Sequence, residues 1–156
     1  MLGALVIGLC TSSWAAAGGS NVIAGVKSIG GYPVSAKYTL ARQIFGGPYS
    51  ETQSGTTCLA RWGGGLTIAW QRRLPYAKWD KACVTFSWAK MSGKLWRTDK
   101  GLRVGSSETQ LRRLYASATR QTSGGYTMWR LAAGSSISLQ AWAKNGRVSF
   151  FRIVRG

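Results

Sequence analysis

The sequence predicts an α+β domain in which an antiparallel sheet carries short helices on one face. The chain has 156 residues and 45% apolar content, which is enough for one domain with a sizeable core. Apolar residues alternate with polar ones in several short segments, and two further segments show helical spacing. The order helix, strand, strand, strand occurs twice, so we expect a single domain over 35–156 built from two α-β-β-β repeats, at about 35–90 and 96–156.

The start of the chain resembles an export signal. An apolar stretch runs through Leu9 and Cys10 and is followed by three alanines before Gly18, which fits an A-x-A cleavage site. We therefore predict a signal peptide over 1–17; the alternative is an apolar first strand or helix of the domain. Residues 18–34 are rich in Gly and Ser and are interpreted as a flexible leader. We expect no transmembrane segment in the mature chain.

The first repeat begins with a predicted helix from Ser35. Tyr38, Ala41 and Phe45 lie at helical spacing, Ser35 suits the N-cap, and Gly46 suits the position after the helix. Strands are predicted at the ranges 58–62, 66–70 and 84–88, with three glycines turning the chain between the first two.

The second repeat begins with a helix capped by Ser107 and Gln110. Its strands are predicted at 127–131, 137–143 and 148–154, the last two joined by Asn145-Gly146 as a two-residue type I′ turn. In that register Ala143 faces Val148 and Ala141 faces Phe150. The four tryptophans on strand faces, Trp62, Trp70, Trp88 and Trp129, are expected in the core, and Val84, Phe86 and Trp88 are expected to share one face.

Cysteine usage agrees with export. If Cys10 leaves with the signal peptide, Cys58 and Cys83 remain as an even pair, which in an oxidising compartment predicts one disulfide. The alternative is two buried free thiols in a cytosolic protein. The expected location is secreted, either extracellular or in the cell envelope.

The charged residues exclude most enzyme chemistry. Twenty-one Lys and Arg against four acids give a net charge of +17, and histidine is absent. Paired carboxylates and clustered metal ligands cannot be assembled convincingly from so few acids. The spacing of Ser87 and Lys90 matches Ser-x-x-Lys, but in a strand residues three apart point to opposite faces. We predict no enzyme activity, no catalytic residue, no metal site and no cofactor.

The densest basic segment is the loop before the third strand, where aromatic residues lie between the cations. Such a combination suits phosphate polymers, anionic glycans or lipid headgroups. The plainer interpretation is a solvated loop with its aromatic rings packed beneath it. The candidate residues for binding an anionic partner are Arg72, Arg73, Tyr76, Lys78, Trp79 and Lys81, backed by Arg97, Lys100 and Arg103.

Several segments carry a resemblance to a known group of proteins. They are residues 98–105, the helix with Leu111 and Tyr115, the strand with Trp129, and the hairpin at 145–148. Together they resemble a family of uncharacterised secreted bacterial proteins whose helix-plus-hairpin unit is similar to the β-lactamase-inhibitor-protein-like fold of SmpA/OmlA-type lipoproteins. The resemblance implies a fold and export, and it implies no catalytic residue. It is strong over 96–115 and looser over 35–154.

These observations predict a basic binding module, secreted or associated with the envelope, that performs no catalysis. Its partner would be an anionic cell-wall polymer, a membrane surface or an acidic protein. The alternative is a nucleic-acid-binding protein, whose affinity would fall steeply with salt.

Overall fold

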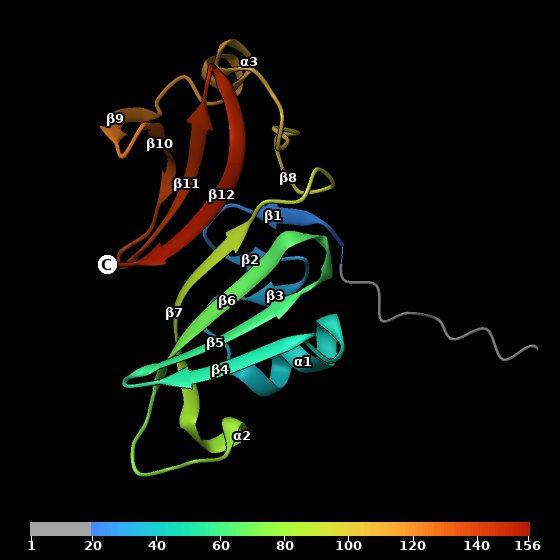
Figure 1. Ribbon diagram of the computed structural model, residues 1–156. Coiled ribbons are helices and arrows are strands. Elements are labelled where there is room, and N and C mark those ends of the chain that lie inside the picture. Colours follow the sequence, from blue (N-terminus) through green and yellow to red (C-terminus); the bar gives the residue numbers. More distant parts are fainter. Residues whose placement is uncertain (1–19) are drawn as a thin grey trace, which may run out of the picture.

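The computed structural model describes residues 20–156 and shows an α+β fold, as predicted (Figure 1). The predicted signal peptide, with Cys10, lies outside the described residues. One antiparallel sheet of eight strands dominates the molecule, and a second sheet has four short strands. The large sheet contains β4 (Ser50–Ser54), β5 (Thr57–Trp62), β6 (Leu66–Arg72), β7 (Cys83–Met91), β9 (Thr119–Ser123), β10 (Tyr126–Ala133), β11 (Ile137–Lys144) and β12 (Arg147–Arg155).

The order of strands in the large sheet is β4-β5-β6-β7-β12-β11-β10-β9. Each half of the chain therefore supplies four consecutive strands, and the last strand of one half pairs with the last strand of the other. The sequence predicted three strands per half and missed the edge strands β4 and β9. Both edge strands are polar, and all five residues of β9 are exposed, so neither shows an apolar alternation.

The prediction of a flexible leader over 18–34 is wrong for residues 20–34, the part of it that the structure describes. Three short strands lie there, β1 (Val22–Ala24), β2 (Ser28–Ile29) and β3 (Tyr32–Pro33), and β1 also pairs in parallel with β8 (Arg97–Thr98). Ile23, Ile29 and Tyr32 are fully buried. The burial of these three apolar side chains offsets the entropy cost of ordering a glycine-rich segment.

The helices pack on one face of the large sheet, as predicted. Helix α1 (Tyr38–Phe45) contacts Trp70 through Tyr38, with ring centroids 5.5 Å apart. Helix α3 (Glu108–Leu114) contacts Trp129, whose Nε1 donates a hydrogen bond to Glu108 at 3.1 Å. Figure 1 shows α1, β2 and β3 behind strands β4–β6. We call this side the covered face and the other side the open face.

The sequence predicted the start of α3 correctly and the start of α1 incorrectly. Ser107 accepts a hydrogen bond from the Gln110 amide at 3.2 Å, so the predicted cap of α3 is confirmed. Helix α1 begins at Tyr38 and not at Ser35; its N-cap is Lys37, which makes no side-chain cap. Gly46 ends the helix with a φ of 80°, which favours glycine. A further short helix, α2 (Trp79–Ala82), was not predicted.

Two β-bulges change which side chains face the core. The register shift in β7 pairs Trp70 with Phe86 and Ala69 with Trp88, so Phe86 lies on the covered face and Trp88 on the open face. The expectation that Trp88 belongs to the core is therefore wrong. A second shift, in β12, pairs Ala141 with Phe151 and not with the predicted Phe150.

The predicted disulfide between Cys58 and Cys83 is present, with Cα atoms 5.8 Å apart. It joins β5 to the start of β7 across the intervening strand β6, and both cysteines are fully buried. No helix among residues 20–156 has the length and apolar character needed to cross a bilayer.

Candidate functional site

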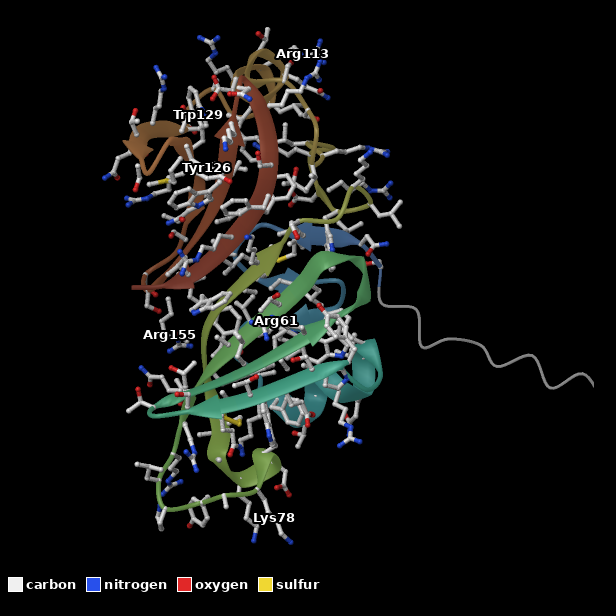
Figure 2. The ribbon with its side chains drawn as sticks, viewed as in Figure 1. Arg61, Lys78, Arg113, Tyr126, Trp129 and Arg155 are labelled. Carbon is white, nitrogen blue, oxygen red and sulfur yellow. A yellow bond between two sulfur atoms is a disulfide. The ribbon has the colours of Figure 1, made fainter. Side chains whose placement is uncertain are left out.

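The basic loop predicted from the sequence lies between β6 and α2, where its two aromatic residues behave differently. Tyr76 is 42% exposed, and the Arg73 guanidinium lies 5.7 Å from its ring centroid. Trp79 instead packs against Tyr38 with ring centroids 4.8 Å apart. The Arg72 Nε is buried without a hydrogen-bond partner among the described residues. Tyr76 therefore lies on the solvated surface, whereas Trp79 packs against α1. Figure 2 shows Lys78 at the outer end of the loop.

The remaining predicted cations lie at the other end of the strands. Arg97 belongs to β8, which pairs with β1, and Lys100 lies over the Tyr115 ring with its Nζ 4.8 Å from the centroid. The nine residues of β7 separate these cations from the loop, a distance of about 30 Å. The sequence-predicted residues therefore form two groups, with Lys81 in the loop group and Arg103 in the β8 group, and not one patch.

A cleft of about 610 Å³ lies between α1, β4 and α2. Within it the Tyr38 hydroxyl donates a hydrogen bond to Glu51. Burial, and then this carboxylate, raise the pKa of Tyr38 to about 12, so the phenol is neutral at ordinary pH. The charged lining residues are Arg42, Lys78, Glu51 and Asp80. Because two carboxylates balance two cations, the cleft does not concentrate charge of either sign.

The open face of the large sheet carries a row of residues that crosses every strand, and four of its members are cations. Residues that are direct partners in adjacent strands point to the same face, so the register of the seven strand pairs defines one continuous row. From β4 to β9 the row reads Ser50, Arg61, Thr67, Lys90, Arg152, Gln140, Arg130 and Thr119. We call Arg61, Lys90, Arg152 and Arg130 the cationic row.

None of the chain's four acidic side chains lies in this row, and all four are among the described residues. Glu51 pairs with a residue of the covered face, and Glu108 accepts its hydrogen bond from Trp129 on the same face. Asp80 and Asp99 each accept a hydrogen bond from the next backbone amide, in α2 and in the turn after β8. No Asp or Glu side chain of the row therefore offsets its positive charge.

The two central cations are direct partners, which is an unfavourable arrangement for like charges. If their charged groups lay one strand spacing apart, at about 5 Å, they would repel by about 1 kcal/mol even in the dielectric of water. Lys90 and Arg152 contact rings on opposite flanks of the row. Lys90 Nζ lies 4.4 Å from the centroid of Phe150, and the Arg152 guanidinium lies 5.2 Å from that of Trp88. Each contact contributes about 0.5–1 kcal/mol at an exposed site and draws the two charged groups toward opposite flanks.

An aromatic cluster borders the row on one flank. Trp142 and Phe150 are stacked with ring centroids 5.6 Å apart, and Tyr126 meets both rings edge-on. The Trp142 Nε1 donates to Gln140 at 3.0 Å, which links this cluster to the row. Lys144 Nζ lies 5.6 Å from the Tyr126 ring centroid. These partly exposed rings therefore hold cations in place and contact one another.

Sequence reasoning missed this row because its members are distant in the chain. Each cation occupies a polar position of an alternating strand, which alone indicates an ordinary solvated face. Only the strand order and the bulge that turns Trp88 outward bring the four cations and their rings together.

No protein-family model matches the chain, and no curated protein matches it. Two solved structures are similar to it at 7% identity: an extracellular protein containing an SCP domain from Bacillus anthracis strain Ames, with a TM-score of 0.45, and a cysteine-rich secretory protein from Staphylococcus aureus Mu50, with a TM-score of 0.48. Each alignment covers 78% of this chain and 44% of the other, so this chain spans less than half the length of either structure. TM-scores below 0.5 transfer no property, and the resemblance to the β-lactamase-inhibitor-protein-like fold is not shown.

Proposed function

We propose that the protein is a secreted or envelope-associated binding module that attaches to an anionic partner and performs no catalysis. The observation that carries this proposal is the cationic row, four positive side chains on one open sheet face with no carboxylate among them. A concentrated patch matters more than the total charge of +17, because salt screens isolated charges beyond about 8 Å.

The disulfide supports placement outside the cytosol. Cys58 and Cys83 are fully buried and cross-linked, as is typical of proteins that fold in an oxidising compartment. Two ionisable side chains that could take part in catalysis have structural roles here. Lys90 lies over the Phe150 ring, and Glu51 accepts a hydrogen bond from Tyr38. These contacts favour binding over catalysis.

Retention on an immobilised polyanion tests the proposal. The oxidised protein is passed over poly(glycerol phosphate) and over a neutral polymer at low and high salt. We expect retention on the anionic matrix alone, with loss of retention as salt rises, because binding releases counterions. Equal retention on both matrices, or none on either, would contradict the proposed function.

A further inference from the structure

The cationic row indicates the shape and chemistry of the anionic partner, an inference that rests on the proposed function. We infer that the row binds one flexible, linear polymer in which phosphate esters alternate with polyol or sugar units, and that the polymer lies across the strands. The outer cations Arg61 and Arg130 are five strand spacings apart, about 24 Å. A ligand that contacts all four cations must therefore be extended.

The polar residues between the cations match such an alternating polymer. Thr67 separates Arg61 from Lys90, and Gln140 separates Arg152 from Arg130. Guanidinium and ammonium groups bind phosphate oxygens, whereas hydroxyl and amide groups both donate to and accept from a polyol hydroxyl. On either side of the central pair of Lys90 and Arg152, the row thus places a neutral hydrogen-bonding group between two cations, as the proposed ligand places a polyol or sugar between two phosphates.

The rings argue against recognition of nucleic-acid bases. Base stacking needs the free face of an aromatic ring. Here Lys90 lies over Phe150, whose ring also stacks on Trp142, and Arg152 lies over Trp88. The rings therefore position the cations in advance, which lowers the entropy cost of binding a charged chain.

The twist of the sheet argues against a flat partner. Adjacent strands rotate by about 20–25°, so the faces that present Arg61 and Arg130 differ in direction by about 100–125° over five steps. Figure 1 shows the change in direction from β4, which runs across the picture, to the upright β10–β12. A planar membrane cannot contact both ends of the row, whereas a flexible chain can follow it.

The test compares charge-matched variants on three defined probes. The row variant is Arg61→Gln/Lys90→Gln/Arg152→Gln. The loop variant, Arg73→Gln/Lys78→Gln/Lys81→Gln, removes three cations of the sequence-predicted patch. A control variant removes three exposed cations from other surfaces. Its substitutions are Lys27→Gln, Lys94→Gln and Arg113→Gln.

Binding of each variant is measured by titration with poly(glycerol phosphate), with oligodeoxythymidylate of the same number of phosphates, and with phosphatidylglycerol vesicles. We expect the wild type to bind poly(glycerol phosphate) at least as tightly as the oligonucleotide. The row variant should lose affinity by about tenfold or more, and the slope of log K against log salt should become shallower by about 2 for three lost contacts. The control variant should show a much smaller loss.

Other outcomes overturn the inference in different ways. A loop variant that loses as much affinity as the row variant moves the site to the loop and leaves the proposed function intact. Tighter binding to the oligonucleotide assigns the face to bases, and tighter binding to vesicles assigns it to membranes. Absence of binding to every probe refutes the proposed function itself.

Circular dichroism checks that each variant folds. If the row variant does not fold, Arg61→Gln/Arg130→Gln provides the second test, because neither side chain makes a ring contact in the structure. We expect it to weaken poly(glycerol phosphate) binding and to make the salt slope shallower by about 1.4. Unchanged affinity in this variant would overturn the assignment of the row.

Discussion

Removal of the disulfide should cost the protein a large part of its stability. The Cys58–Cys83 bond closes a loop with a sequence separation of 25 residues. In the chain-entropy model a loop of this length stabilises the folded state by about 3.5 kcal/mol, because the cross-link restricts the unfolded chain. Small domains have about 5–15 kcal/mol in total, so the change is severe without preventing folding outright.

The assay is urea unfolding of the Cys58→Ala/Cys83→Ala variant, followed by tryptophan fluorescence. With an m-value of about 1.5–2 kcal/mol per molar urea, the midpoint should fall by about 2 M relative to the oxidised wild type. Reduced wild-type protein is the matched control, since it lacks the cross-link and keeps both sulfur atoms. Any difference between it and the variant measures how the sulfur atoms pack in the core.

A midpoint shift below about 0.5 M would refute this reasoning, because it corresponds to about 1 kcal/mol. It would mean that the eight-stranded sheet alone restrains β5 and β7, or that the unfolded chain is already compact. An intact mass that does not change on reduction would refute the cross-link itself.

Three further predictions follow from local contacts. Ser107→Ala should lower the free energy of unfolding by about 1 kcal/mol, because the Ser107 side chain caps α3, and thermal unfolding measures the loss; an unchanged Tm would show that the cap is dispensable. Gly93→Ala should destabilise by about 2 kcal/mol or more, because its Cβ would collide with the Gly64 carbonyl oxygen. Gly47→Ala, whose Cβ meets no atom within 4 Å, should have little effect in the same urea titration. Burial raises the pKa of Tyr32 and of Tyr38 to about 12, so the folded state keeps protons that the unfolded state loses above pH 10. The contribution of these two tyrosines to the free energy of unfolding should be complete below pH 10 and should be lost between pH 10 and 12. Tyr32→Phe or Tyr38→Phe should make this loss smaller, and an unchanged pH profile in both variants would contradict the assignment.

The sequence predicted the fold class, with short helices on one face of the sheet, the disulfide and the cap of α3. These features depend on local signals: apolar alternation, helical spacing and turn residues. The strand β9 has no such signal, because its pairing with β10 is made by backbone groups while all five side chains stay exposed. The strands within residues 20–34 form because Ile23, Ile29 and Tyr32 are buried in a core to which the rest of the chain contributes, and no local pattern indicates this.

The cationic row could not be predicted from the sequence for a different reason. Lys90 and Arg152, which are 62 positions apart in the chain, are neighbours because β7 pairs with β12. A one-residue bulge decides whether Trp88 is core or surface, and alternation alone assigned it to the core. Charge density along the chain therefore indicated the loop, whereas the strand register produced the row.

The position of the β7–β12 pair at the middle of the large sheet has a consequence for any elongated ligand. Arg61 and Lys90 come from one half of the chain and Arg152 and Arg130 from the other, at mirror positions in the strand order. An antiparallel pair at the centre relates the two sets by an approximate half-turn about an axis through the sheet. A chain reversed end for end would meet the same succession of charges, so the charges alone do not distinguish the two directions of a polymer.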